Sequence, residues 1–298
     1  MKFDPRRELG SLRGQKLDRS ELELGDITIN IQAVGYKRSS KPRPKRLGRM
    51  HLVIPDCQVK PDVDISHLRW IGRYIVDKQP DVVVCIGDFA DMPSLSSYDR
   101  GKKCFEGRRY KKDIEAAVNG MAQLMAPLME YNAAQSPKNR YKPRLVMTLG
   151  NHDGDRINRA IEDDARLDGV IGISDLRYEE FGWQVYPFLE IVEIDWISYS
   201  HYFCSGVMGR PCSSAAVMLR ERMGSCIAGH VQKFDLAVHP KTGHIAMMVG
   251  IAHVHDELYL TPQGNNCRRQ IVVLNEVRDG RFDPMLVSLA FLQKRYDD

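Results

Sequence analysis

The feature that most constrains this chain is the alternation, from Met50 onward, of short apolar runs with longer amphipathic stretches. Apolar runs of about four to eight residues bounded by polar ones are typical of strands, and apolar residues spaced three or four apart are typical of helices. Alternating strands and helices favour parallel pairing and therefore an α/β fold. The predicted strands are Met50–Ile54, Asp81–Ile86, Arg144–Leu149, Phe188–Tyr199, Ser225–Ala228, Ile245–Ile251 and Ile271–Asn275, and the predicted helices are Ile65–Lys78, Lys112–Asn132 and Ala215–Met223.

Five of the predicted strands end in short segments rich in Asp, Asn, His or Gln. In open α/β sheets ligands bind beyond the carboxyl ends of the strands, so these segments can bring their side chains together. Oxygen and imidazole donors of these kinds are common ligands of divalent metals. Any one segment alone is an ordinary turn, but five in this order are far more specific. They are Asp56–Gln58, Gly87–Asp91, Gly150–Asp153, His201 and Gly229–Gln232.

Composition argues against several classes of protein. No run approaches the roughly 18–20 apolar residues of a membrane-spanning helix, so no membrane association is expected. The charged N-terminus lacks the apolar stretch of a secretory signal. The seven cysteines are scattered and form no Cys-x-x-Cys pair, which argues against a zinc ribbon or a thioredoxin-type motif. We expect reduced thiols and a cytoplasmic protein.

Positive charge is concentrated at the N-terminus. Residues 1–50 hold 13 Lys and Arg against 6 Asp and Glu, and the densest part, Tyr36–Arg49, has seven basic residues, two prolines and no acid. Such a stretch cannot bury apolar surface, so residues 1–49 are predicted to form a basic, extended arm before a body at residues 50–298. The arm is either a solvated linker or a contact for the phosphate backbone of nucleic acid.

Read in order, the five segments are DCQ, GDFAD, GNHD, SYSH and GHVQ. This series resembles the calcineurin-like metallophosphoesterases, whose signature is DxH, GDxxD, GNH[DE], a separate histidine and GHxH. The resemblance covers residues 50–235 by motif and does not extend to residues 1–49. It implies that residues 50–298 form a metallophosphoesterase catalytic domain, with an α/β fold of two stacked mixed β-sheets flanked by helices.

The same resemblance implies a centre for two divalent ions and a proton donor. In this family two such ions clamp a phosphoryl group and lower the pKa of the attacking water. His152 matches the proton donor, and Asp91 matches the carboxylate that orients it. Asp88 would bridge the ions, one held by Asp56, Gln58, Asp88 and Gln232, and the other held by Asp88, Asn151, His201 and His230.

The chain departs from the family pattern at Gln58 and Gln232, where the family has histidine. Both would bind the same ion through a neutral carbonyl oxygen, which favours Mn²⁺, with Mg²⁺, Zn²⁺ or Fe as alternatives. Either this is an oxygen-rich two-metal site, or its first position holds metal only together with substrate. The presence of Asp56 and Asp88 favours the first interpretation.

Two further departures bear on the substrate. Protein phosphatases of this superfamily carry arginines where this chain has Met92 and Leu149. Because those arginines hold the free oxygens of a phosphate monoester, their replacement favours phosphodiesters. Arg156, Arg159 or Arg140 could substitute for them, although solvation at the surface is the more ordinary role for each.

A second basic cluster lies between the second and third motifs, with Phe105 and Tyr110 interleaved. Cations alternating with aromatic rings suit single-stranded nucleic acid, and the alternative is a solvated loop at the start of a helix. The candidate substrate-binding residues here are Lys102, Lys103, Arg108 and Arg109, followed by Lys111 and Lys112.

We therefore expect a cytoplasmic, metal-dependent phosphodiesterase or nuclease that acts on DNA or RNA. The alternatives are a phosphoesterase acting on a nucleotide or cyclic nucleotide, and a nucleic-acid-binding protein with a weakened metal centre. His253 and His255 have a metal-like spacing on a predicted strand, where both side chains would share one face, but they match no ligand of the family. They are interpreted as a rim of the site or as a satisfied face of the sheet.

Overall fold

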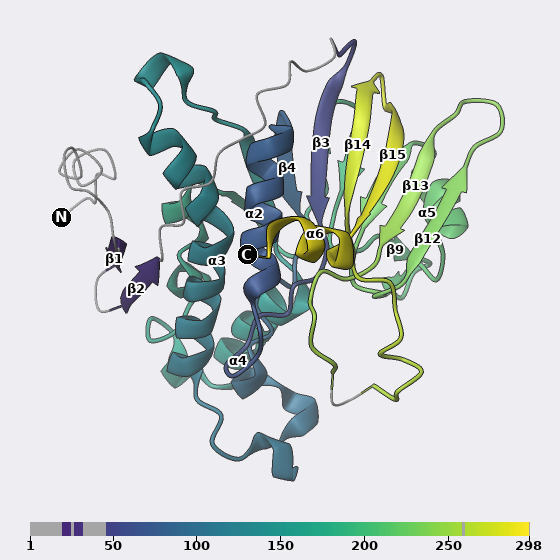
Figure 1. Ribbon diagram of the computed structural model, residues 1–298. Helices are drawn as coiled ribbons and strands as arrows, with labels where there is room; N and C mark the ends of the chain where they lie inside the picture. The colour runs from purple at the N-terminus through teal and green to yellow at the C-terminus, as the bar shows by residue number, and fades with distance from the viewer. Residues whose placement is uncertain (1–19, 25–26, 32–45, 258–259, 298) are drawn as a thin grey trace.

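Two mixed β-sheets lie at the centre of the computed structural model, which describes residues 20–24, 27–31, 46–257 and 260–297 (Figure 1). The six-stranded sheet has the order β15-β14-β3-β4-β5-β6, with β3 to β6 parallel and β14 antiparallel to both its neighbours. Its strands are β3 (Arg49–Ile54), β4 (Val82–Cys85), β5 (Arg144–Thr148), β6 (Gln184–Tyr186), β14 (Gln270–Arg278) and β15 (Arg281–Ser288).

The five-stranded sheet has the order β12-β13-β11-β8-β7. Here β8, β11 and β13 are parallel, and the two edge strands are antiparallel to their neighbours. Its strands are β7 (Val192–Ile194), β8 (Ile197–Tyr199), β11 (Ser225–Ala228), β12 (Phe234–Val238) and β13 (Ile245–Val249). Two hairpins of short strands add β1 (Ser20–Leu24), β2 (Ile27–Ile31), β9 (Cys204–Ser205) and β10 (Arg210–Pro211).

The two sheets stack because their strands are apolar on both faces. Val53 belongs to a buried cluster shared by the two sheets, whereas its neighbour Leu52 belongs to a cluster shared with the helices. On the far side of the five-stranded sheet, Ala246 packs with Ala215 of a short helix. The order of layers is therefore helices, six-stranded sheet, five-stranded sheet, helix. The predicted fold class, α/β with two stacked mixed sheets flanked by helices, is confirmed.

Two long helices, α2 (Ser66–Lys78) and α3 (Tyr110–Ala133), cover the outer face of the six-stranded sheet and lie side by side (Figure 1). Gly72 makes their contact possible, because a β-carbon there would collide with the carbonyl oxygen of Leu124 and lie 2.9 Å from Cγ of Pro127. The other α-helices are α4 (Arg156–Asp163), α5 (Ala215–Arg222) and α6 (Leu289–Tyr296). The single turns used below are η1 (Pro93–Leu95), η3 (Lys103–Phe105) and the π-helical turn η5 (Asn151–Asp155).

The prediction of a single strand over Phe188–Tyr199 is wrong. The chain forms the hairpin β7–β8 instead, and its two-residue turn has φ of 52° at Asp195 and 64° at Trp196. Positive φ at both positions is the geometry of a type I′ turn, which matches the twist of a hairpin. Asp is common at the first position of such a turn, but the second position, where glycine is usual, holds Trp196, so the sequence pattern did not indicate the turn.

Most of the predicted N-terminal arm, residues 1–49, lies outside the described residues. Within it the structure describes the hairpin of β1 and β2 and the segment from Arg46 onward. Arg46 pairs with Asp81 at 3.1 Å, and the backbone N–H groups of Leu47 and Gly48 donate to Glu276. Among the described residues, no helix is both long and apolar enough to cross a membrane.

Candidate metal centre

The ends of five strands, drawn from both sheets, meet at one edge of the sandwich. Asp56, Asp88 and Asn151 follow β3, β4 and β5 of one sheet, and His201 and His230 follow β8 and β11 of the other. The turns are joined directly, since the N–H groups of residues 57 and 58 both donate to the carbonyl oxygen of Asp88, at 3.1 and 2.9 Å. The structure thus brings together five of the predicted metal ligands.

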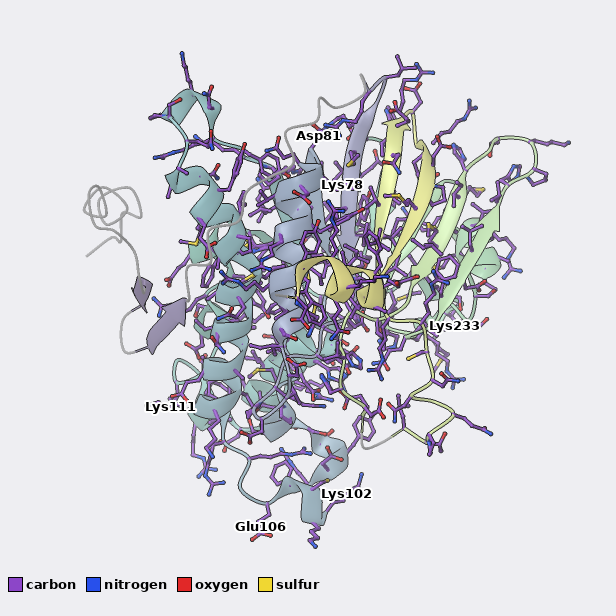
Figure 2. All side chains as sticks on the ribbon, viewed as in Figure 1. Lys78, Asp81, Lys102, Glu106, Lys111 and Lys233 are labelled. Carbon is purple, nitrogen blue, oxygen red and sulfur yellow. The ribbon has the colours of Figure 1, made fainter. Side chains whose placement is uncertain are left out.

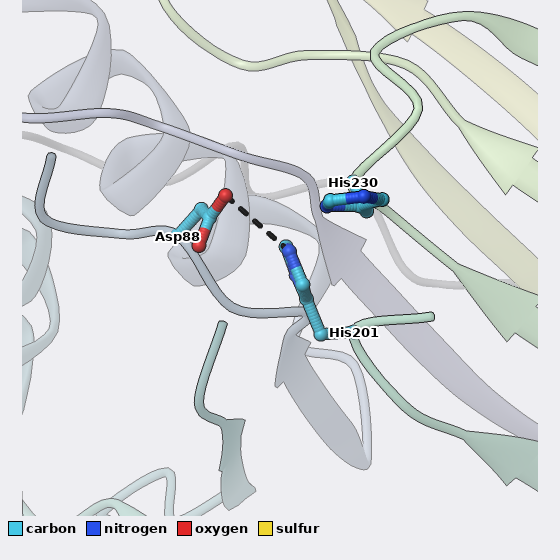
Figure 3. Close-up of side chains that lie close together, drawn as sticks. All are labelled: Asp88, His201 and His230. Atoms are coloured by element: carbon cyan, nitrogen blue, oxygen red, sulfur yellow. Dashed lines mark ion pairs between the residues drawn. The ribbon is translucent and has the colours of Figure 1, made fainter. Parts of the chain in front are cut away.

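The side chains of Asp88, His201 and His230 turn toward one another (Figure 3). A ligand atom from each lies within 4.8 Å of the other two. His201 Nε2 is 3.3 Å from Asp88 Oδ2, and Asn151 Oδ1 lies 3.0 Å from that nitrogen and 2.8 Å from His230 Nδ1. Four side chains therefore share one small volume.

Histidine orientation favours a cation in this volume. His201 Nδ1 lies 2.9 Å from the carbonyl oxygen of Ile86, which can only accept, so Nδ1 carries the proton. In the neutral ring, Nε2 is then an acceptor that faces two other acceptors, on Asp88 and Asn151. A divalent ion satisfies all three lone pairs at once, and a backbone partner on the opposite nitrogen is the usual support of a metal-binding histidine.

Asp56 and Gln58 adjoin this group, since Asp56 Oδ1 accepts from the N–H of His230 at 3.3 Å and the N–H of Gln58 donates to the carbonyl oxygen of Asp88. Both are completely buried. Asp56 Oδ2 and both side-chain polar atoms of Gln58 have no hydrogen-bond partner among the described residues. Buried polar groups are nearly always paired, because an unpaired one costs about 1–3 kcal/mol. The residues present therefore fit a bound cation at this position too.

Strained backbone accompanies these residues. Gln58, Asp88, His230 and Gln232 have φ of 44°, 49°, 64° and 58°. Non-glycine residues rarely adopt this left-handed conformation, which costs about 1–2 kcal/mol each. Strain of this kind is concentrated at functional sites, where the fold holds a side chain in a required direction. The predicted ligand Gln232 lies half-buried in the same turn as His230.

Glycines of the motifs leave room for the carboxylates. A β-carbon on Gly150 would overlap Asp88 Oδ1, and one on Gly229 would overlap Asp56 Oδ1. These two glycines come from turns after β5 and β11, whereas the carboxylates they face come from turns after β4 and β3. Each glycine is therefore required by a contact between two motifs.

The pKa values indicate unbalanced negative charge. Burial and the nearby charge of Asp88 raise the pKa of Asp56 to about 7, although His201 opposes the shift. Burial disfavours the imidazolium of His201, but Asp88 and then Asp56 outweigh it and raise the pKa of His201 to about 9. Protons here compensate for carboxylates packed close together, and a divalent cation would replace them.

His152 and Asp91 form a buried pair beside this cluster. His152 Nδ1 is 2.6 Å from Asp91 Oδ1, and the backbone N–H of His152 donates to Asp88 Oδ1 at 2.8 Å. Arg156 donates to Asp91 Oδ1 at 3.1 Å, and Lys60 Nζ lies 3.2 Å from Asp91 Oδ2. Burial favours the neutral acid, yet His152 and these two cations hold the pKa of Asp91 far below its usual range.

A cavity of about 470 Å³ opens next to this pair. Arg156 and Asp91 line it together with three of the predicted substrate-binding residues, Lys102, Arg108 and Arg109. Lys103 lies in η3 but does not line it. Figure 2 shows Lys102 and Glu106 at the end of the molecule opposite Lys78 and Asp81, consistent with a site beyond the carboxyl ends of the strands.

The basic cluster is less available than the sequence suggested. Asp99 pairs with Arg108 at 2.8 Å and with Lys102 at 3.2 Å. The guanidinium of Arg108 lies 5.6 Å over the ring of Phe105, and the hydroxyl of Tyr110 donates to Asp175 at 2.7 Å. The cavity lining contains six basic and seven acidic residues. Neither aromatic ring is therefore an open stacking platform, and the lining is nearly neutral.

Sequence reasoning missed several residues of the site. Asp153 is buried, and its two oxygens accept from the N–H groups of Gly150 and Phe89 at 2.7 and 2.9 Å, which joins the second and third motifs. Lys60 pairs with Asp91, and the ring of Tyr202 lies 4.7 Å from that of His230. Each of the three lies in or directly beside a recognised motif, and that position was the available signal.

His253 and His255 were expected on a strand, and this prediction is wrong. Strand β13 ends at Val249, and both histidines lie in the loop that follows. Gly250, with φ of 81°, breaks the extended conformation before they are reached. Their rings nevertheless lie close together, at 4.4 Å between centroids.

No family model matches the chain. Two curated relatives are proteins named Gene 54 protein, from Mycobacterium phages D29 and L5. The first is 29% identical over 199 residues and the second 28% identical over 194 residues. Each comparison covers 63% of this chain and 71% of the relative.

Solved structures that resemble this chain include wild-type Vps29 from Entamoeba histolytica, crystallised in complex with Zn²⁺. It has a TM-score of 0.35 and 12% identity, and the match covers 80% of this chain and 99% of that one. Another is a predicted phosphoesterase from Streptococcus pneumoniae, with a TM-score of 0.30, 12% identity, and coverage of 80% of this chain and 97% of that one. Both likenesses are distant.

Proposed function

We propose that this chain is a metal-dependent phosphoesterase that hydrolyses phosphodiesters. The side chains that meet at the ends of the strands, called here the strand-end cluster, would form its two-metal centre. The observation that carries the proposal is the convergence of Asp56, Gln58, Asp88, Asn151, His201 and His230 from two sheets, with unpaired acceptors inside the cluster. Asp88 is proposed to serve both ions, because its carboxylate lies 3.3 Å from His201 and its carbonyl oxygen accepts from the turn that carries Gln58. Such ions neutralise charge on a phosphoryl group and lower the pKa of the attacking water.

His152 is the proposed proton donor to the departing oxygen. Its Nδ1 is held by Asp91, so the proton transferred would be the one that Nε2 carries when the ring is protonated. Burial opposes protonation, but the charge of Asp88 and the hydrogen bond with Asp91 raise the pKa of His152. Arg156 Nη2 lies 3.4 Å from that Nε2, where a guanidinium would also meet a phosphate oxygen.

Preference for diesters is supported by two buried apolar residues. Met92 is 0% and Leu149 2% exposed, so neither position offers a charged group to a monoester's additional free oxygen. Arg156, already bonded to Asp91, is the cation nearest the proposed proton donor among those described. We propose Mn²⁺ as the preferred ion, because three of the proposed ligands are neutral amide oxygens, on Gln58, Asn151 and Gln232.

Nucleic acid is the proposed substrate class, supported by the basic composition of residues 1–50 and by the exposed Lys102 and Arg109 beside the cavity. Since Phe105 and Tyr110 are engaged within the fold, contacts to the phosphate backbone would supply most of the affinity. Each of the seven cysteines is free, which suits action in a reducing cytoplasm.

A second candidate is a phosphodiesterase for a small substrate such as a nucleotide. The observation in its favour is the 470 Å³ cavity beside His152, which lies in the size range of small-ligand pockets and has nearly balanced charge. Comparing the rate of hydrolysis of short DNA or RNA with that of a cyclic nucleotide separates the two candidates. Faster hydrolysis of the cyclic nucleotide would favour the second.

The test is turnover of a chromogenic phosphodiester and of the matching monoester in Mn²⁺, Mg²⁺ and Zn²⁺. The Asp88→Asn variant serves as the inactive reference, and Asp163→Asn, an exposed carboxylate on α4, serves as the matched control. We expect diester turnover in Mn²⁺ from the parent chain and the control but not from Asp88→Asn. Preference for the monoester would overturn the diester proposal. Lack of turnover in every metal, together with salt-sensitive DNA binding, would favour a binding protein instead.

A further inference from the structure

A second histidine cluster lies in the loop after β13, outside the strand-end cluster. The rings of His253 and His255 stack at 4.4 Å with 26° between their planes. One ligand atom from each of these histidines and one from Glu257 lie within 4.8 Å of one another. His253 is 1% and Glu257 3% exposed. Groups of this kind are seldom buried together without a ligand or a proton network that pairs them.

Each ring retains a nitrogen without a partner. His253 Nδ1 donates to the carbonyl oxygen of His255 at 2.8 Å, and His255 Nε2 lies 2.9 Å from Glu257 Oε1. The opposite nitrogens, Nε2 of His253 and Nδ1 of His255, are buried without a hydrogen-bond partner among the described residues. In the neutral ring, His253 Nε2 is a lone pair, and His255 Nε2, which faces Glu257, is one when its proton lies on Nδ1. A lone pair on neutral imidazole is a metal ligand.

A third histidine faces the same region from α2. His67 is completely buried, and neither of its ring nitrogens has a partner in the part of the chain that the structure describes. Burial, with smaller effects from the charges of His253 and His255, lowers the pKa of His67 to about 3. His67 is not one of the residues whose ligand atoms lie within 4.8 Å of one another, so the proposed site rests on the loop residues His253, His255 and Glu257.

The loop is held in place by residues other than the histidines. Asn265 accepts from the N–H of Glu257 at 2.8 Å and donates to its carbonyl oxygen at 3.0 Å. Arg269 donates to the carbonyl oxygen of Val254 and pairs with Asp256. Contacts of this kind fix the direction of a ligand before an ion arrives.

We propose that His253, His255 and Glu257 form a separate binding site for a divalent transition-metal ion, called here the loop-histidine site. Two imidazoles and one carboxylate are a ligand set suited to Zn²⁺ and leave a further coordination position for water or for His67. Lys60 contacts both oxygens of Glu257, at 2.7 and 2.6 Å, and also lies 3.2 Å from Asp91. It can therefore stay on Asp91 when an ion takes an oxygen of Glu257.

The test measures the zinc bound by the full chain. Every protein compared also carries the substitution Asp88→Asn, which weakens metal binding at the strand-end cluster. Purified proteins are stripped with a chelator, dialysed against free Zn²⁺ and measured by inductively coupled plasma mass spectrometry. We expect the combined substitution His253→Asn and His255→Asn to lose about one zinc ion per chain relative to Asp88→Asn alone. The control is His239→Asn, because an asparagine oxygen can replace the exposed ring nitrogen that accepts from residues 241 and 242.

The melting temperature of each protein, measured in chelator, shows whether the histidine substitutions disturb folding. If they do, Glu257→Gln provides a milder variant. The amide keeps the shape of the side chain but removes its charge, so zinc affinity is expected to fall by about tenfold or more. Unchanged zinc content and affinity in Glu257→Gln, or an equal loss of zinc in His239→Asn, would overturn the proposal. Because the readout is bound zinc, neither result depends on turnover.

Discussion

At the scale of single residues, Asp88 connects the parts of the candidate centre. Its carboxylate accepts from the N–H of His152 at 2.8 Å and lies 3.3 Å from His201 Nε2, and its carbonyl oxygen accepts from the turn that carries Gln58. Because Gly150 lacks a β-carbon, it leaves room for this carboxylate. Metal ligands and proposed proton donor are thus positioned through one residue, and changes at its neighbours can separate the two roles.

Replacement of His152 by alanine is expected to slow diester hydrolysis by about 10²–10⁴ while bound metal stays nearly constant, because the backbone N–H that contacts Asp88 remains. Turnover and metal content are measured on the same preparation, with His239→Ala as the control on an exposed histidine. Loss of the metals, or turnover equal to that of the parent chain, would show that His152 is not the proton donor.

At the scale of elements, most strands of the body could be predicted because a short apolar run and the polar turn after it are local features. The type I′ turn at Asp195 and Trp196 could not, because its second position, where glycine is usual, holds Trp196. Strand β15 was missed because its sequence is interrupted by Asp283 and Pro284, and its pairing with β14 determines its conformation. For proline, an edge strand is the usual position.

The candidate site shows the same division between local and distant signals. Its proposed metal ligands could be named from the sequence because they follow apolar runs. The hydrogen bond that the N–H of Phe89 donates to Asp153 and the contact of Lys60 with Glu257 join segments 64 and 197 residues apart. No local pattern contains such pairings. The two histidines, His253 and His255, were visible in the sequence, but the loop that stacks their rings was not.

The packing of α2 on α3 predicts that replacing Gly72 by alanine destabilises the protein, which is the opposite of the usual effect in a helix. Glycine to alanine inside a helix usually stabilises by about 1 kcal/mol. At Gly72 the added carbon would meet the backbone of Leu124, so we expect Gly72→Ala to lower the free energy of unfolding by about 1–3 kcal/mol. Urea denaturation measures it, with Glu115→Ala on an exposed part of α3 as the control. An increase in stability would contradict the close contact.

At the scale of the whole molecule, the proposed ligands connect the two sheets. Asp56, Asp88 and Asn151 follow strands of one sheet, and His201 and His230 follow strands of the other. Bound ions would therefore link halves of the sandwich that otherwise meet through apolar side chains such as Val53 and Ile227. Metal binding and stability should be coupled.

Removal of metal is accordingly expected to lower the melting temperature. An ion present at 100 times its Kd stabilises the native state by about 2.7 kcal/mol, which corresponds to several degrees for a chain of this size. Scanning calorimetry in Mn²⁺ and in chelator measures the difference. Asp88→Asn should show a much smaller shift. An equal shift in that variant would place the stabilising ion elsewhere, and the loop-histidine site would be the first position to examine.

The most direct test of the two-metal centre is anomalous X-ray diffraction from crystals of the full chain grown with Mn²⁺, recorded on both sides of the manganese absorption edge. We predict two peaks about 3.5–4 Å apart with Asp88 between them, one beside Asp56 and Gln58 and the other beside His201 and His230. A single peak, or none at Asp88, would contradict the account.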